Sequence, residues 1–198
     1  MPKPSQVRRV ADAETEGRPA PRAAAWEGQP TRDVILRALR EIYAGPAWHG
    51  PSMREALRGV SPDAAARRVA PGRNTIWELV LHLAYTRHRL LHRMGAAEER
   101  QFPRRFTKSW WPAAPAEPTP AAWRADLALL ADYQARLVAA VGRAPLARLR
   151  ITRPGQRRTI AHELLGVAFH DAYHAGQIRL LARLAAEAAA GAARRASA

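Results

Sequence analysis

Apolar residues recur at helical spacing in four separate segments of the chain, and this pattern constrains the fold more than any other feature. The segments cover residues 31–45, 75–94, 119–142 and about 159–189. Residues three and four positions apart share one face of an α-helix, so each segment predicts a helix with one apolar face. No convincing alternation typical of a β-strand is found. Four helices that must each bury such a face favour an all-α four-helix bundle.

Residues with special backbone preferences mark the ends of these helices. Thr75 and Glu78 have the spacing of a capping box, in which each side chain accepts from the other residue's backbone amide. Pro120 follows a threonine, which is typical of the first turn of a helix. We expect Gly142 to close the third helix and the Ala-rich end of the fourth to fray beyond about Ala189.

The connections between the helices differ in character. Ser52 and Ser61 each precede a short stretch that predicts one helical turn or two, so the first connection is long but ordered. Five prolines fall between residues 95 and 120. Because proline interrupts both helices and sheets, we expect a long crossover loop there without regular structure.

Length and composition leave room for one domain with a full core. The chain has 198 residues, of which 47% are hydrophobic. We predict a disordered N-terminal extension at residues 1–30, the helical bundle at 31–190 and a frayed C-terminal tail at 191–198. No leader pattern and no run of roughly 20 apolar residues is present, so we expect a soluble cytoplasmic protein without membrane association.

Charge and cysteine content exclude some classes of function. The chain has no cysteine, so any metal ion must be held by His, Asp or Glu side chains. A net charge of +15 raises the possibility of nucleic-acid binding through phosphate contacts. The arginines are scattered, however, and no nucleic-acid motif is present, so nucleic acid is an unlikely partner.

Seven histidines are present, and two pairs have the i, i+4 spacing that brings both rings to one side of a helix. The β-carbons of such a pair lie about 6 Å apart, close enough to share a metal ion. His88 and His92 lie among arginines, which indicates a solvated helix face. His170 and His174 lie in an apolar stretch destined for the core, where unpaired imidazoles need a partner.

His82 is the candidate third ligand. It is a polar residue inside an otherwise apolar run, Leu79–Ala84. Three nitrogen ligands with open positions are typical of catalytic metal sites. From the residues alone, a core histidine bonded to a backbone carbonyl is an equally good interpretation of His82.

Two motifs bring in a resemblance to a known family. The stretch Thr75–Ala84 and the stretch His170–Ile178 resemble the DinB family, also called DinB/YfiT-like metalloenzymes, and the likeness covers about residues 31–188. It implies a four-helix bundle, often a homodimer, around one divalent ion, with zinc or nickel favoured and iron or manganese also compatible. The implied ligands are His82, His170 and His174.

Six further residues are candidates for the second shell or the pocket of such a site: His49, Glu78, Tyr85, Arg89, Tyr173 and Gln177. The capping box already explains Glu78, and a turn explains His49. Tyr85 and Arg89 continue the face of His82, where substrate contact and ordinary packing or surface charge are equally good explanations. Tyr173 and Gln177, like Asp171, can hydrogen-bond to ligands or to other helices.

The resemblance also suggests a class of reaction. Members of the family include S-transferases that use low-molecular-weight thiols and a thiol-dependent isomerase. We therefore expect a metal-dependent enzyme acting on a small molecule, either a hydrolase or a thiol S-transferase. A zincin-type protease is disfavoured, because no Glu lies between His170 and His174. The alternatives are a non-enzymatic metal-binding stress protein and, less favoured, an Arg-rich nucleic-acid binder.

Overall fold

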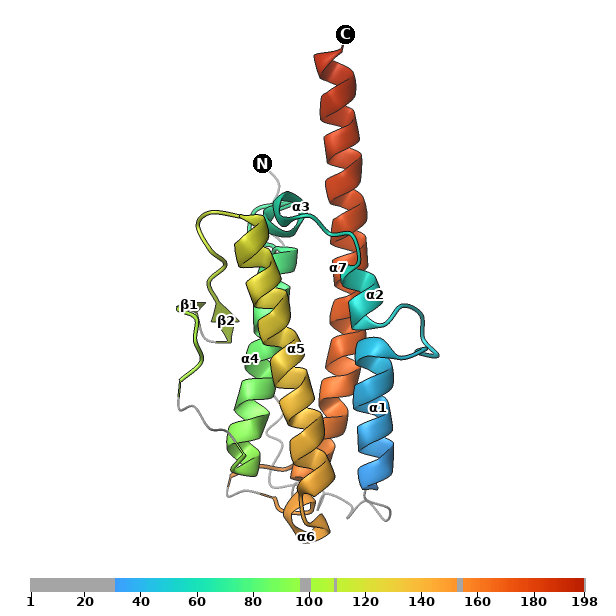
Figure 1. The fold of residues 1–198 in the computed structure, drawn as a ribbon, viewed down its shortest axis with the longest axis vertical. Helices are drawn as coiled ribbons and strands as arrows, with labels where there is room; N and C mark the ends of the chain where they lie inside the picture. Colours follow the sequence, from blue (N-terminus) through green and yellow to red (C-terminus); the bar gives the residue numbers. More distant parts are fainter. Residues whose placement is uncertain (1–30, 97–100, 109, 153–154, 198) are drawn as a thin grey trace, which may run out of the picture.

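The computed structural model describes residues 31–96, 101–108, 110–152 and 155–197, and it is mostly helical (Figure 1). The predicted N-terminal extension lies outside these described residues. Among them, no helix has the length and apolar character needed to cross a membrane.

Four long helices form a bundle, which confirms the all-α prediction (Figure 1). They are α1 (Arg32–Ala44), α4 (Ile76–Met94), α5 (Pro120–Arg143) and α7 (Ile160–Ala196). Helix α4 contacts α5 and α7, and α1 contacts the same two helices. Each long helix therefore packs against two neighbours around a common core.

The helix starts follow the predicted capping chemistry. The hydroxyl of Thr75 accepts from the Glu78 amide at 3.1 Å, and the Glu78 carboxylate accepts from the Thr75 amide at 2.7 Å. The other three long helices begin with a threonine whose hydroxyl accepts from a backbone amide three residues later: Thr31, Thr119 and Thr159. Gly95 ends α4 in the left-handed conformation, with φ of 67°.

Two short helices join α1 to α4, as the sequence predicts. They are α2 (Met53–Leu57) and α3 (Pro62–Ala66), capped by Ser52 and Ser61. Helix α2 contacts α1 and α7, and α3 contacts α4 and α7. The connection therefore covers part of the bundle.

The expectation that no regular element occurs between residues 95 and 120 is wrong. Strands β1 (Phe106–Lys108) and β2 (Trp111–Pro112) pair as a short antiparallel ribbon. Pro112 fits because each strand of a two-stranded ribbon has an open edge, where a missing amide leaves no partner unsatisfied. Strand β2 contacts α4, so the ribbon lies against the bundle.

The third long helix does not end at Gly142, as expected, but continues through Arg143. Pro145 explains the actual end, because the residue before a proline is disfavoured in helical conformation. Ala144 is accordingly extended, with φ of −65° and ψ of 134°. A further short helix, α6 (Leu146–Leu149), follows.

Helix α7 continues past the expected end near Ala189 to Ala196. Alanine and arginine, which dominate this stretch, are strong helix formers. Figure 1 shows the C-terminal part of α7 projecting beyond the rest of the bundle. Most of the predicted tail at residues 191–198 is therefore helical.

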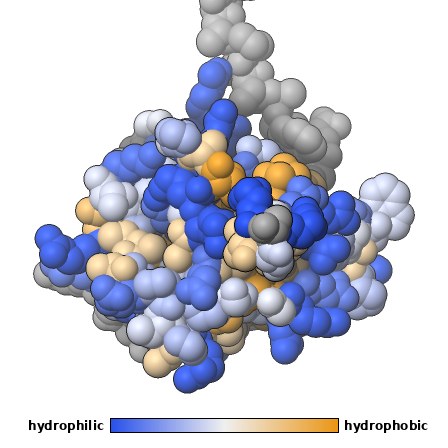
Figure 2. All heavy atoms as spheres, turned by 90° about the horizontal axis from the view of Figure 1, so that it is seen from above, coloured by the Kyte–Doolittle hydropathy of each residue, from blue (hydrophilic) through white to orange (hydrophobic). Residues whose placement is uncertain are grey.

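The core consists of the inward faces of the four long helices. Its fully buried members include Ile35, Leu39, Trp77, Leu81, Leu83, Leu130, Leu137 and Ile178. Seen along the bundle from above, hydrophilic residues cover most of the surface, with smaller apolar patches between them (Figure 2). The sequence thus separates apolar and polar faces as a bundle requires.

Candidate metal centre

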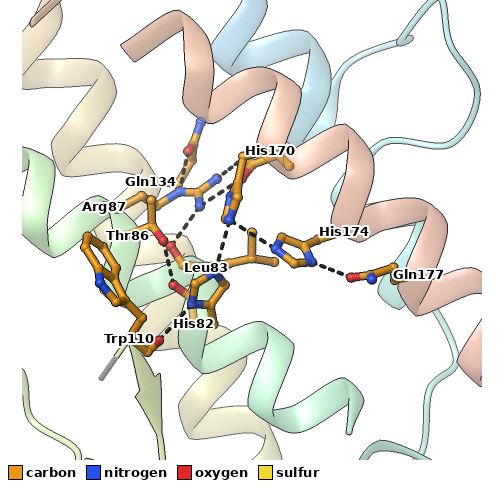
Figure 3. A network of polar contacts seen from close by, with 10 residues as sticks. His82, Leu83, Thr86, Arg87, Trp110, Gln134, His170, His174 and Gln177 are labelled. Carbon is orange, nitrogen blue, oxygen red and sulfur yellow. Dashed lines mark hydrogen bonds and ion pairs between the residues drawn. The ribbon is translucent and has the colours of Figure 1, made fainter. Parts of the chain in front are cut away.

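Three histidine side chains meet between α4 and α7 (Figure 3). The Nε2 atom of His170 lies 3.0 Å from Nε2 of His82 and 3.0 Å from Nε2 of His174. Each ring offers one ligand atom, and these three atoms all lie within 4.8 Å of one another. In the described part of the chain, no other three His, Cys, Asp or Glu side chains are grouped in this way.

The helices explain this convergence. His170 and His174 lie one turn apart on α7, so both rings project from the same side of that helix. His82 lies in the apolar face of α4, which packs against α7. His82 and His174 are buried, whereas the side chain of His170 is 30% exposed. His170 is therefore the member of the group that reaches solvent most easily.

Hydrogen bonds at Nδ1 orient two of the rings, and the bond of His82 also defines its tautomer. The Nδ1–H group of His82 donates to the carbonyl oxygen of Trp110 at 2.8 Å, because a carbonyl can only accept. The Nδ1–H group of His174 donates to Oε1 of Gln177 at 2.6 Å. In this orientation of the amide, the amide nitrogen of Gln177 donates to the Tyr173 hydroxyl at 2.9 Å.

This arrangement fits a divalent metal ion. With both Nδ1 atoms protonated, neutral His82 and His174 each present an Nε2 lone pair toward His170. One N–H group on His170 cannot make two full hydrogen bonds. Tetrahedral zinc with Zn–N distances of 2.0–2.1 Å would separate its nitrogen ligands by about 3.3 Å, a few tenths more than the two 3.0 Å separations. Neutral imidazoles also suit nickel and iron.

Burial favours the neutral forms of His82 and His174. It is the largest influence on the pKa of His82, which lies below its usual value, while the bond to the Trp110 carbonyl partly opposes the shift. Burial, followed by repulsion from His170, lowers the pKa of His174 to about 4. Metals bind the neutral form of imidazole, so both rings are in the binding form at pH 7.

The ribbon orients His82 from outside the bundle. The ring of Trp111 stacks on the His82 imidazole, with centroids 4.3 Å apart and planes inclined by 15°. Trp110 supplies its carbonyl from a left-handed backbone conformation, with φ of 70°, which is unusual for a large side chain. In the sequence Trp110 and Trp111 are adjacent residues in a proline-rich stretch, and no spacing rule connects them to His82.

A buried polar network ties the same helices together behind the histidines (Figure 3). Arg87 on α4 forms an ion pair with Asp171 on α7, and both side chains are fully buried. The Nε–H group of Arg87 also donates to Oε1 of Gln134 on α5 at 2.8 Å. The amide of Gln134 donates in turn to the carbonyl of Leu39 on α1 at 2.8 Å. The network thus joins all four long helices.

Asp171 brings this network next to the histidine group, since it follows His170 directly in α7. Oδ1 of Asp171 lies 3.7 Å from Nδ1 of His170, too far for a hydrogen bond. That Nδ1 atom is buried and has no hydrogen-bond partner in the described structure.

Comparison with known proteins identifies the family. A family model for the DinB superfamily matches residues 48–178, which is more than half of the chain. The chain belongs to the DinB superfamily. The matched range contains all three histidines and is narrower than the range of about 31–188 over which the motifs suggested a resemblance. No match was found among curated proteins or among solved structures.

Two of the six additional candidates have structural roles in this DinB-superfamily protein. Glu78 completes the capping box of α4 and also pairs with Arg68 at 2.7 Å. Tyr85 packs edge-on against Phe102 and Phe106. Helix capping and packing therefore account for both residues.

The other four candidates divide between the site and the surface. Gln177 contacts His174 directly, and Tyr173 contacts Gln177. Arg89 is exposed, with its guanidinium carbon 5.5 Å from the centre of the Trp110 ring, and it lines the same cavity as His170. His49 lies in an exposed turn between α1 and α2 and does not belong to the histidine group.

The expected solvated face at His88 and His92 is only half correct. His92 is exposed, but His88 is buried, and its Nδ1 atom lies 3.3 Å from the Tyr133 hydroxyl. The expectation was based on Arg87, Arg89 and Arg93, which are close to His88 and His92 in sequence but do not all lie on one face of the helix. Successive residues point about 100° apart around a helix, so Arg87 faces the core while Arg89 faces solvent.

Proposed function

We propose that this DinB-superfamily protein is a metal-dependent enzyme acting on a small molecule, as a hydrolase or as a thiol S-transferase. One observation carries the proposal: three Nε2 atoms converge while hydrogen bonds hold His82 and His174 at their Nδ1 atoms. A divalent ion bound there would lower the pKa of a coordinated water or thiol toward neutrality and so supply the nucleophile.

The surrounding residues would hold the ligands in place. The Trp110 carbonyl and Gln177 orient the rings of His82 and His174, and the carbonyl also fixes the tautomer of His82. Such outer hydrogen bonds typically change metal affinity or activity 10- to 100-fold when removed. The stack of Trp111 on His82 excludes water from one face of that ring.

Substrate would approach beside His170. This side chain is the most exposed of the three and lies in the wall of a cavity of about 570 Å³. A cavity of that size suits a small molecule. In a thiol transfer, the sulfur would form a bond to an electrophilic carbon, the leaving group would depart with its electron pair, and the thiol proton would pass to solvent.

Elemental analysis of the purified protein tests the metal site. We expect about one equivalent of a divalent metal in the wild type and none in His170→Ala or His174→Ala, because two imidazoles bind far more weakly than three. His49→Ala is the matched control and should keep the metal, since His49 lies in an exposed turn. Metal retained by both site variants would contradict the proposal.

The reaction class has its own test. Consumption of 1-chloro-2,4-dinitrobenzene with cysteine as the thiol should require both the thiol and the metal-loaded protein. Hydrolysis of p-nitrophenyl acetate, assayed without thiol, tests the alternative in which water is the nucleophile. Activity that survives removal of the metal would exclude both versions, and bound metal without either activity would favour the non-enzymatic alternative.

A further inference from the structure

The charges that line the cavity beside His170, and not only its volume, indicate which ligands it can bind. The cavity lies between α4 and α7, and its wall includes Trp110 and the turn that precedes α7. Residues of the first turn of α7, His162 and Glu163, also line it. The N-terminal end of a helix carries a partial positive charge, so the backbone at this end of the cavity favours anions.

Arginine side chains dominate the charge of the wall. Four of them line it: Arg89, Arg93, Arg157 and Arg158. The acidic residue in the described part of the wall, Glu163, already pairs with Arg93 at 2.5 Å. Within the described ranges, no acidic partner is found for the other three, and all three are exposed. The cavity therefore holds an excess of about three positive charges next to a candidate metal ligand.

We propose that this cavity binds small organic oxyanions, and that the substrates of the site carry a carboxylate or phosphate group. The guanidinium group of arginine presents parallel N–H donors that match two oxygens of either group. A cluster of like charges in a concave site also raises the local concentration of anions and their rate of entry. The inference rests on the proposed function for the reaction at His170, but anion binding itself depends on the arginines.

Calorimetric titration of metal-free protein with two probes, phthalate and phenyl phosphate, tests this inference. We expect at least one probe to bind, and phthalamide, the neutral analogue of phthalate, not to bind measurably. Arg157→Ala combined with Arg158→Ala should weaken binding by about tenfold or more, because charged hydrogen bonds to the anion are lost. No binding of either probe at millimolar concentration, or equal binding of phthalamide, would overturn the proposal.

A second arginine-lined cavity provides the matched control. It has a similar volume of about 580 Å³, includes Arg67 and Arg183, and contains none of the three clustered histidines. Arg67→Ala combined with Arg183→Ala removes the same number of positive charges from the other cavity and should change probe affinity by less than about twofold. Equal weakening in both double variants would show that overall charge, rather than this cavity, binds the anion.

Two further measurements keep the result interpretable. Arg89→Gln should also weaken probe binding, and it serves as the test if the first double variant does not fold by circular dichroism. His174→Ala should lose metal but still bind the probe in the metal-free assay. If the protein binds the probe but no metal, the inferred anion site stands and the proposed function fails. If it binds metal but no probe, the proposed function stands and the inferred anion site fails.

Discussion

At the scale of single residues, His174 makes the stability of the metal-free protein depend on pH. Its pKa is lowered from 6.5 to about 4 in the folded chain. Between these two values the unfolded chain binds a proton that the folded chain does not, so the free energy of unfolding rises with pH there. Thermal denaturation of metal-free protein should therefore show a lower midpoint at pH 5 than at pH 7.

The His174→Gln variant is the control for this pH effect. Glutamine does not titrate in this range, so the difference between the midpoints at pH 5 and pH 7 should shrink. The lowered pKa of His82 will leave part of the dependence in place. An unchanged difference in the variant would show that His174 is not the source.

The sequence pattern predicted the positions of the three histidines, and the DinB resemblance favoured His82 as the third ligand. Spacing places His170 and His174 on one side of α7, and the apolar run around His82 predicts its burial. The carbonyl interpretation of His82 also proved correct, since its two ring nitrogens serve different partners. The role of Trp110 could not be predicted, because a loop has no period and its contacts depend on the tertiary fold.

At the scale of the elements, the ion pair between Arg87 and Asp171 fastens α4 to α7. Removing one partner of a buried pair leaves an uncompensated charge, so Arg87→Met should lower the free energy of unfolding by about 3–5 kcal/mol. Combining it with Asp171→Leu should cost less than the sum of the two single changes, because the double variant leaves no unpaired charge. Chemical denaturation measures these values.

Arg37→Met is the control for Arg87→Met, because it breaks an arginine–carboxylate pair that is exposed instead of buried. Arg37 pairs with Glu41 on the surface of α1, where solvent screens the interaction, so its loss should change stability little. Equal effects at Arg37 and Arg87 would contradict the special importance of the buried pair.

Helix boundaries were predictable wherever a local rule governs them. Threonine and serine caps define the starts because their hydroxyl groups bond to amides three residues away. Pro145 outweighed Gly142 at the end of α5, since glycine only lowers helix propensity whereas proline restricts its neighbour sterically. The ribbon escaped prediction because its two strands, Phe106–Lys108 and Trp111–Pro112, are too short to show alternation.

At the scale of the whole molecule, α7 presents an apolar stripe that nothing in the described chain covers. Four large hydrophobic residues with 39–69% exposure lie on one side of this helix: Phe169, Tyr173, Leu180 and Leu184. Their spacings of four, seven and four residues keep them within about 60° of one another. Such stripes are typical of protein interfaces, and we propose that this one joins two copies of the chain.

Light scattering coupled to gel filtration tests this homodimer. The wild type should elute as a dimer, and Leu180→Glu should shift it to monomer, because two copies of the charge would be buried at the interface. Trp48→Glu is the control, since Trp48 is 99% exposed in the turn between α1 and α2 and does not belong to the apolar stripe of α7. A wild-type monomer at tens of micromolar would contradict the proposal.

The distribution of the three imidazoles along the chain also sets an order of events during biosynthesis. His82 leaves the ribosome 88 residues before His170, so the complete ligand set cannot form while α4 alone has been made. Closing so long a loop is slow and entropically unfavourable until the intervening helices condense. Binding of the proposed ion by all three rings would therefore have to follow translation through His174.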